Sequence, residues 1–101
     1  MADEAPNDVE VRRNDTAHRY ELLVDGELAG VADYRPSREP GVLVFPHTEV
    51  DPSRRGSGLG EVLVRRALDD VRARGERVVP ACWFVAEFFD LNPDYAELRA
   101  P

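Results

Sequence analysis

The sequence predicts an α/β (α+β) fold, in which a mixed, mostly antiparallel sheet of about five strands carries one main helix and short C-terminal helices. Three observations support this fold class. The N-terminal half contains apolar runs separated by turn signals. A segment with helical periodicity follows a glycine-rich turn, and a β-branched run follows that segment. A helix between two strands is a crossover, which adds a parallel pair to an otherwise antiparallel sheet.

A hairpin is expected in the N-terminal part of the chain. A short alternating pattern begins at Val9–Val11, and Arg19–Val24 is a stronger strand candidate. Asp25-Gly26 follows at once. An Asp-Gly pair between apolar segments favours a tight turn because glycine readily adopts positive φ. The chain is therefore expected to return as a strand over residues 27–34.

A further strand is expected over residues 42–50, after a polar loop. Pro46 interrupts this segment. A proline donates no hydrogen bond to a neighbouring strand, so the strand is expected to be bulged, splayed or at an edge there. Bulges often lie beside active sites.

The main helix is expected to begin near Gly58 and to end at Arg74-Gly75. Residues 77–82 are then typical of a buried strand, residues 84–91 fit a short helix, and Pro93 suits the first turn of a last helix. The apolar residues of the main helix recur on one face. They are Leu63, Val64, Ala67, Leu68 and Val71.

Composition bounds the class of protein. The 101 residues, 43% hydrophobic and 33% charged, fit a disordered leader at residues 1–8 and a single domain at residues 9–101. The net charge of -7 disfavours nucleic acid as a partner. No apolar run is long enough for a membrane span, and no secretory signal is evident, so a cytoplasmic location is expected.

The residue types present exclude several kinds of active site. The sequence contains no lysine, which excludes a Walker-type phosphate loop and a lysine Schiff base. One cysteine and two histidines are too few for a Cys/His zinc site within this chain, so no metal is expected.

The glycine-rich turn is the most informative segment. Gly56, Gly58 and Gly60 alternate just before the helix. Their backbone N–H groups and the helix N-terminus together favour a phosphate or pyrophosphate ligand. An ordinary turn without a ligand is the alternative. A dinucleotide-binding G-x-G-x-x-G motif from Gly56 is excluded because Glu61 stands where its last glycine is needed.

Four segments, in order, carry a resemblance to a known family. They are His47-Thr-Glu-Val50, Arg55-Gly-Ser-Gly-Leu-Gly60, Val78-Val-Pro-Ala-Cys-Trp-Phe84 and Asn92-Pro-Asp-Tyr95. The glycine turn resembles the R/Q-x-x-G-x-G/A signature of the GNAT N-acetyltransferases. The set looks like a group of very short GNAT-like proteins, and the resemblance covers roughly residues 19–96.

The resemblance implies that acetyl-coenzyme A, the co-substrate, lies in a cleft between two splayed strands, those ending near Val50 and beginning near Arg77. Backbone groups of residues 44–50 would pair with the pantetheine arm, and the turn would hold the pyrophosphate. Arg54 as a plain solvated residue is an alternative. The residues implied to bind coenzyme A are Val50, Arg54, Arg55, Gly56, Ser57, Gly58, Leu59 and Gly60. Residues 54–77 also hold seven arginines against four acidic residues, as a polyanionic ligand needs.

Four residues are candidates for a role in catalysis. His47 and Glu49 share one face of their strand, so either is a candidate base, against the alternative of a structural histidine and a solvated glutamate. Cys82 is a candidate nucleophile, a lining residue without covalent chemistry, or simply core. Tyr95 either protonates the departing thiolate or packs its ring on the sheet.

The leading prediction is an enzyme that transfers an acetyl group from acetyl-coenzyme A to an unidentified amine acceptor, a small amine or a protein amine. The alternative is a coenzyme A-binding module without turnover, since the short chain lacks segments that build the acceptor site in larger GNAT enzymes. The sequence specifies neither the acceptor nor the oligomeric state.

Overall fold

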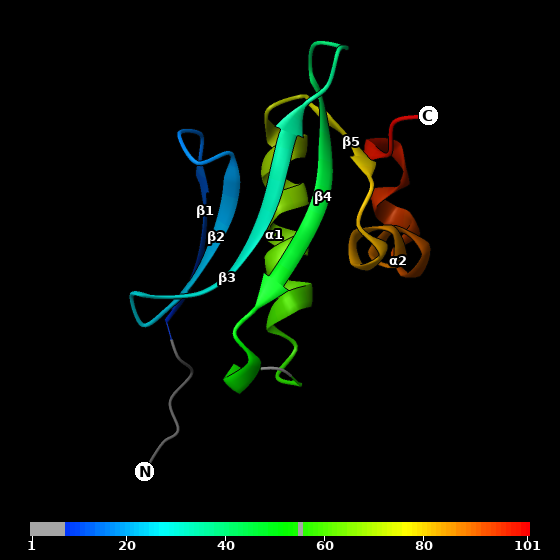
Figure 1. The fold of residues 1–101 in the computed structure, drawn as a ribbon. Coiled ribbons are helices and arrows are strands. Elements are labelled where there is room, and N and C mark those ends of the chain that lie inside the picture. Colours follow the sequence, from blue (N-terminus) through cyan, green and yellow to red (C-terminus); the bar gives the residue numbers. More distant parts are fainter. Residues whose placement is uncertain (1–7, 55) are drawn as a thin grey trace.

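A computed structural model describes residues 8–54 and 56–101 of the chain (Figure 1). The predicted leader therefore falls, except for Asp8, outside the described residues. Within these ranges no helix combines the length and apolar character needed to span a membrane. The strands are β1 (Val9–Asn14), β2 (Arg19–Val24), β3 (Glu27–Pro36), β4 (Val42–Val50) and β5 (Arg77–Pro80). The helices are α1 (Leu59–Ala73) and α2 (Trp83–Leu91), with 3-10 helices at Pro52–Arg54 and Pro93–Leu98.

The strands form one mixed sheet in the order β1-β2-β3-β4-β5. The first four are antiparallel to their neighbours, and β5 is parallel to β4. Helix α1 supplies the crossover between β4 and β5. The predicted fold class is confirmed. At the predicted hairpin, Asp25 and Gly26 have φ angles of 51° and 82°, both positive as a type I′ turn requires.

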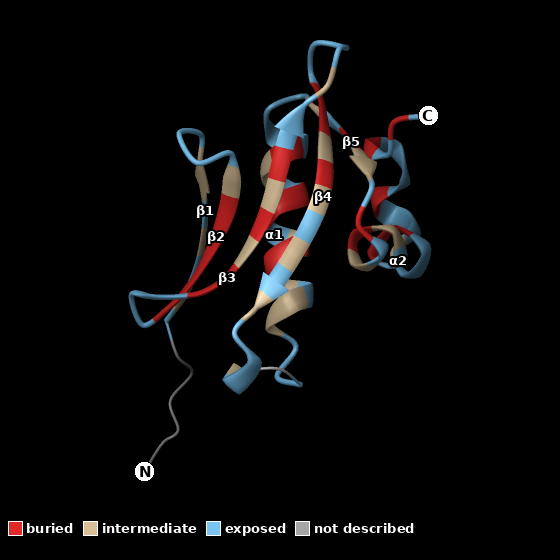
Figure 2. Cartoon of the chain, in the orientation of Figure 1, coloured by how far each residue is buried: buried red, intermediate tan, exposed pale blue. Residues whose placement is uncertain are grey.

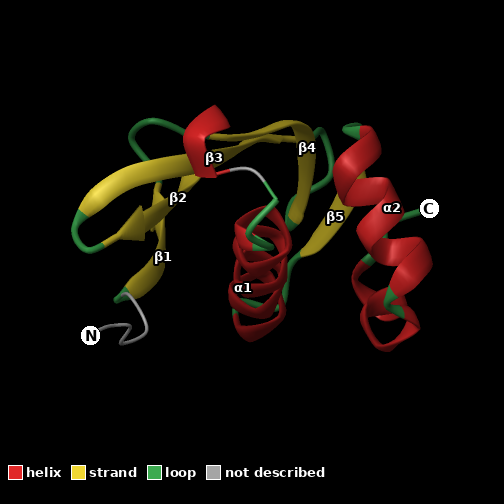
Figure 3. Cartoon of the chain, turned by 90° about the horizontal axis from the view of Figure 1, so that it is seen from below, coloured by secondary structure: helices red, strands yellow, loops and turns green. Residues whose placement is uncertain are grey.

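The core lies between the sheet and α1. All the residues predicted to share one face of α1 are fully buried (Figure 2): Leu63, Val64, Ala67, Leu68 and Val71. They pack with Tyr20, Leu22 and Phe45 of the sheet. The sheet arches over α1, and α2 lies beyond β5 (Figure 3). The apolar periodicity of α1 therefore decides which face of the sheet is covered.

Strand β4 contains one extra residue at the predicted interruption. Asp33 of β3 pairs with His47, and Arg35 pairs with Val44, so two steps along β3 match three along β4. The extra residue reverses the faces of the strand. Before the shift Phe45 is buried in the core, whereas after it His47 projects into solvent.

Strand β5 is shorter than predicted and ends at Pro80. The Ala81 N–H turns back to the Val79 carbonyl oxygen at 3.1 Å, and the Cys82 N–H donates to the Phe45 carbonyl oxygen at 2.9 Å. Cys82 therefore lies at the N-cap of α2 and not in the strand. Because β5 pairs with β4 only as far as Phe45, residues 46–50 of β4 have no strand partner on that side within the described part of the chain.

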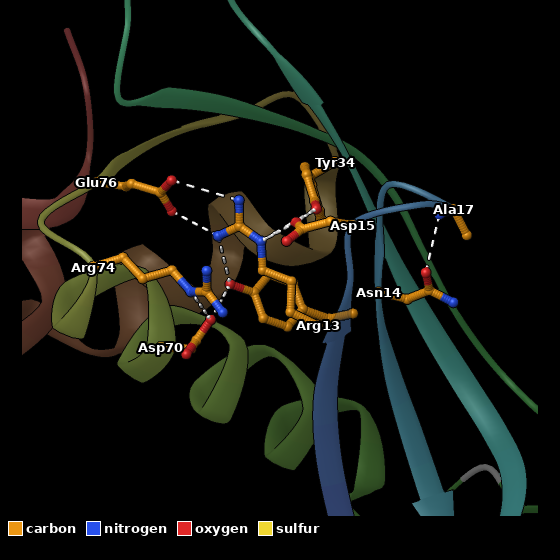
Figure 4. Close-up of polar contacts among 9 residues, drawn as sticks. Arg13, Asn14, Asp15, Ala17, Tyr34, Asp70, Arg74 and Glu76 are labelled. Atoms are coloured by element: carbon orange, nitrogen blue, oxygen red, sulfur yellow. Dashed lines mark hydrogen bonds and ion pairs between the residues drawn. The ribbon is translucent and has the colours of Figure 1, made fainter.

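A polar cluster ties β1 to the C-terminal end of α1 and the loop that follows it. We call it the Arg13 cluster (Figure 4); it comprises Arg13, Asp15, Tyr20, Tyr34, Asp70, Arg74 and Glu76. The guanidinium of Arg13 donates to Glu76 and to Asp15, each at 2.7 Å. The Tyr20 hydroxyl donates to Asp70 at 2.7 Å. These bonds join segments far apart in the sequence.

Candidate active site

A cleft of about 1100 Å³ opens where β5 stops and β4 continues. Its walls are β4 from Pro46 to Val50, the glycine turn with the first residues of α1, and one side of α2. Small-ligand pockets usually measure about 300–1000 Å³. The cleft is therefore large enough for more than one small ligand, and it lies where the resemblance implies one.

The glycine turn presents backbone to this cleft. Gly56 and Gly58 have φ angles of 84° and 80°, and nothing lies within 4 Å of the position a Cβ would take at either. Gly58 is the N-cap of α1, with no side-chain hydrogen bond capping the helix. Among the described residues, the N–H groups of Leu59, Gly60 and Glu61 find no acceptor. The positive end of α1 is thus open toward the cleft.

Gly60 is required for a different reason. A Cβ at this helical position would lie 3.0 Å from Cζ of Phe84 in α2. The Phe84 ring therefore packs on the first turn of α1 and joins the two helices at the edge of the cleft. Sequence reasoning assigned all three glycines to the phosphate, because a contact between α1 and α2 leaves no local pattern.

The other predicted turn residues occupy different places. Arg54 and Leu59 line the cleft, and the Arg54 guanidinium lies 3.5 Å from Oε1 of Glu27. The Ser57 hydroxyl donates to the Arg54 carbonyl oxygen at 2.5 Å and lies outside the cleft wall, so it holds the turn. Arg55 lies outside the described residues.

Asp51 fixes the exit from β4 into the turn. Its Oδ1 accepts a hydrogen bond from the Ser53 backbone N–H at 3.0 Å and another from the Ser53 hydroxyl at 2.9 Å. These bonds lower the pKa of Asp51, the backbone N–H having the larger effect. A carboxylate in this position caps the 3-10 helix that precedes the glycine turn.

His47 and Glu49 form a pair on the cleft wall. His47 Nε2 lies 3.1 Å from Glu49 Oε1, and the side chains are 55% and 62% exposed. The predicted shared face is confirmed. In a neutral imidazole this contact places the proton on Nε2, which leaves Nδ1 free to accept one.

Cys82 and Thr48 lie deeper in the cleft wall. Cys82 is 9% exposed and belongs both to the core cluster and to the lining of the cleft. The Thr48 hydroxyl is buried and has no hydrogen-bond partner within the described residues. Unpartnered buried hydroxyls are uncommon. No local pattern indicated a role for Thr48, because the isolation of its hydroxyl depends on the strand shift at Pro46.

Helix α2 contributes a further wall of the cleft. Trp83, Glu87 and Leu91 line the cleft from one face of this helix. Tyr95 lies elsewhere: it is buried, and its hydroxyl donates to Asp69 at 2.7 Å. Burial, followed by this hydrogen bond, raises the pKa of Tyr95. Tyr95 is therefore a packed residue, and its ring packs edge-on against Phe88 of α2, with 5.3 Å between the ring centroids.

Residues 19–98 match the family model described as GCN5-related N-acetyl-transferase. The chain belongs to the GCN5-related N-acetyltransferase (GNAT) family. The match covers the glycine turn, both cleft-lining helices and every strand except β1. Within residues 8–54 and 56–101, no group of three or more potential ligand side chains is placed to hold a metal ion.

Two curated relatives match parts of the chain. Streptothricin acetyltransferase of Streptomyces lavendulae is 45% identical over 51 residues, which are 50% of this chain and 27% of that protein. Protein NATD1 of Bos taurus is 34% identical over 62 residues, 59% of this chain and 55% of that protein. The matches thus span about half the length, or less, of these relatives.

The same arrangement of sheet and helices occurs in solved structures. The IAA acetyltransferase from Bacillus cereus ATCC 14579 superposes with a TM-score of 0.57 at 14% identity, over 84% of this chain and 74% of that chain. At this identity the likeness concerns the fold alone.

Proposed function

We propose that the chain transfers the acetyl group of acetyl-coenzyme A to a primary amine. The observation that carries the proposal is that the free edge of β4 at residues 46–50 and the open N-terminus of α1 face one cleft. A free strand edge pairs with an extended amide chain, and a helix N-terminus binds phosphate. Coenzyme A carries both groups, and membership of the GNAT family supports the same ligand.

In this proposal the N–H groups around Gly56, Gly58 and Gly60 bind the pyrophosphate. Arg54 lies beside the turn and adds positive charge. The backbone of residues 46–50 pairs with the pantetheine arm, which directs the thioester toward Cys82, where the cleft meets α2.

His47 and Glu49 supply the base. An alkylammonium with a pKa of about 10.4 is neutral in only about one molecule in 2,500 at pH 7. Glu49 orients the imidazole through Nε2, and Nδ1 of His47 accepts the proton of the ammonium. The neutral nitrogen then attacks the thioester carbonyl carbon. The C–N bond forms, the C–S bond breaks, and the departing thiolate takes up the second proton of the nitrogen.

Cys82 offers a covalent route that is tested separately. Its thiolate would attack the thioester, release coenzyme A as the thiol, and pass the acetyl group to the amine. Mass spectrometry after incubation with acetyl-coenzyme A alone checks this. An added acetyl group that is absent from Cys82→Ala supports the route, whereas full turnover by Cys82→Ala excludes it.

Binding is tested by calorimetry with coenzyme A. A side chain at a φ near 80° costs about 1–2 kcal/mol, so Gly58→Ala is expected to displace the phosphate-binding amides and to weaken binding about tenfold. Gly75→Ala is the matched control: Gly75 has a φ of 73°, equally open space at Cβ, and a place at the far end of α1. Equal affinities for the two variants would contradict the phosphate site.

Turnover is tested by release of the coenzyme A thiol across a panel of primary amines. We expect His47→Gln to reduce kcat at neutral pH by about 100-fold with unchanged coenzyme A affinity, as expected for loss of a general base. Tight binding with no release for any amine would favour the coenzyme A-binding module. Absence of binding at millimolar coenzyme A would exclude both functions.

A further inference from the structure

One face of α2 is exposed although it carries large apolar side chains. Trp83, Glu87 and Leu91 recur at intervals of four residues, so they share a face of the helix. Trp83 is 73% exposed and Leu91 is 72% exposed. We call these three residues the α2 outer face. All three also line the cleft.

The apolar part of this face is not needed to hold α2 in place. The helix is anchored by Val85, Phe88 and Phe89, which are buried in the core. Covering a large apolar side chain that is otherwise in water gains about 1.5–3 kcal/mol. Trp83 and Leu91 are therefore available to a ligand that enters the cleft.

The charges of the cleft differ between the N-terminal end of α1 and the α2 outer face. Glu61 forms an ion pair with Arg65 at 2.9 Å, and Glu49 is engaged by a hydrogen bond with the His47 ring at 3.1 Å. Glu87 lies between Trp83 and Leu91 and has no ion-pair partner within the described residues. An anion is favoured at the open N-terminus of α1, and a cation is favoured at the α2 outer face.

From this combination we infer that the α2 outer face binds the acceptor and selects a small primary ammonium that carries an aromatic or other apolar group. The inference rests on the proposed function. The ammonium lies near the Glu87 carboxylate, and the apolar group covers Trp83 and Leu91. An ammonium near the face of an indole is also attracted to its π system. Release of the proton to His47 then readies the amine for transfer.

The position of the single tryptophan allows a direct test without turnover. Trp83 is the only Trp of the 101 residues, so its fluorescence reports on this face in the unmodified protein. In the presence of saturating coenzyme A, which transfers no acetyl group, the chain is titrated with 2-phenylethylammonium, ethylammonium and 2-phenylethanol. We expect a saturable emission change with 2-phenylethylammonium, at least about tenfold tighter than with ethylammonium because the phenyl ring is buried. The uncharged 2-phenylethanol is expected to bind several-fold more weakly.

Two pairs of variants isolate the charge and the apolar contact. Glu87→Gln is expected to weaken 2-phenylethylammonium binding about threefold and to leave 2-phenylethanol unchanged, whereas Glu10→Gln on β1 changes neither. Leu91→Ala is expected to weaken both aromatic ligands, in contrast to Leu28→Ala, an exposed leucine of β3 outside the cleft wall. Coenzyme A affinity, measured by calorimetry, is expected to be equal in all four variants.

Three results would overturn the inference. The first is that coenzyme A alone produces the full change in Trp83 emission and the amine adds nothing, which would assign the α2 outer face to the cofactor. The second is that the protein sediments as a dimer whose Trp83 emission shifts on dilution, which would assign the α2 outer face to a second copy of the chain. The third is that no amine in the titration changes the emission of Trp83 although coenzyme A binds. If an amine binds but no thiol is released in the turnover assay, the proposed function is contradicted. The amine-binding site on the α2 outer face would still be supported.

Discussion

The two ends of α1 lie in opposite surroundings. At its C-terminal end, Arg13 is 10% exposed at its side chain and is held by Glu76, Asp15 and two tyrosine hydroxyls. At its N-terminal end, backbone N–H groups have no acceptor among the described residues, and the Thr48 hydroxyl is buried without a partner.

This difference separates the part of the molecule that stabilises the fold from the part available for chemistry. Unpartnered buried polar groups are rare in folded proteins because each one loses its hydrogen bonds to water. In the Arg13 cluster these groups are satisfied by the protein itself. At the cleft the Thr48 hydroxyl and the first N–H groups of α1 have no partner among the described residues, and in the proposed function a ligand satisfies them. Each of the following changes tests this separation of roles.

The largest effect is expected from Arg13→Ala. Removing this guanidinium leaves the Glu76 carboxylate, which is 20% exposed, without its ion-pair partner, and breaking a largely buried ion pair costs about 3 kcal/mol. Urea unfolding measures the change, with Arg38→Ala, an exposed arginine, as the near-neutral control. Coenzyme A affinity of the folded Arg13→Ala protein is expected to be unchanged, and a parallel loss would show that the two ends are not separate.

A smaller effect is expected from Gly60→Ala. The added methyl would lie 3.0 Å from the Phe84 ring and must displace it, which we expect to lower the free energy of unfolding by about 1–2 kcal/mol. The double variant Gly60→Ala/Phe84→Leu makes room for the methyl. Recovery of stability in the double variant supports close packing, and an unchanged deficit would mean that Gly60 is needed for another reason.

Thr48→Val tests the role of the buried Thr48 hydroxyl, which has no hydrogen-bond partner among the described residues. The substitution keeps the shape and removes a buried group that has no partner, so the ligand-free protein is expected to gain about 1 kcal/mol. If the hydroxyl serves a ligand, coenzyme A affinity falls in the same variant. Loss of stability together with unchanged affinity would place Thr48 among ordinary structural residues.

The smallest effect concerns alkaline pH. Burial, and then the hydrogen bond to Asp70, raise the pKa of Tyr20 above its usual value near 10. The native state therefore favours the protonated phenol, so this contribution to stability is present below pH 10 and declines as pH rises above it. The expected loss is about 0.4 kcal/mol at pH 10, where half of the unfolded-state phenols ionise. Unfolding curves from pH 8 to 11 measure it, and Tyr20→Phe should remove the dependence attributable to this residue.

Local patterns were sufficient for much of the fold. Asp25-Gly26 predicted the hairpin because two residues alone decide a type I′ turn. The period of the α1 residues predicted its buried face, and Pro46 predicted an irregular strand. The position of Cys82 at the N-cap of α2, rather than in β5, was missed because a hydrogen bond to Phe45 decides it.

The site was less accessible to sequence reasoning. The shared face of His47 and Glu49 follows from strand alternation alone, so it was predicted correctly. The contact between Gly60 and Phe84 depends on how two helices meet, which has no signature in either segment. The same applies to the bond between Arg13 and Glu76, whose positions differ by 63 residues.

The extra residue in β4 decides which face of the sheet carries the side chains of residues 47–50. If β3 and β4 paired in regular register without this bulge, with Pro46 taking part in the alternation, every side chain after Pro46 would move to the opposite face. His47 and Glu49 would then turn toward the core side of the sheet, while the hydroxyl of Thr48 would emerge into solvent. A shift of one residue in the pairing of β4 thus decides which side chains reach the cleft, although the α1 core would be the same in both arrangements.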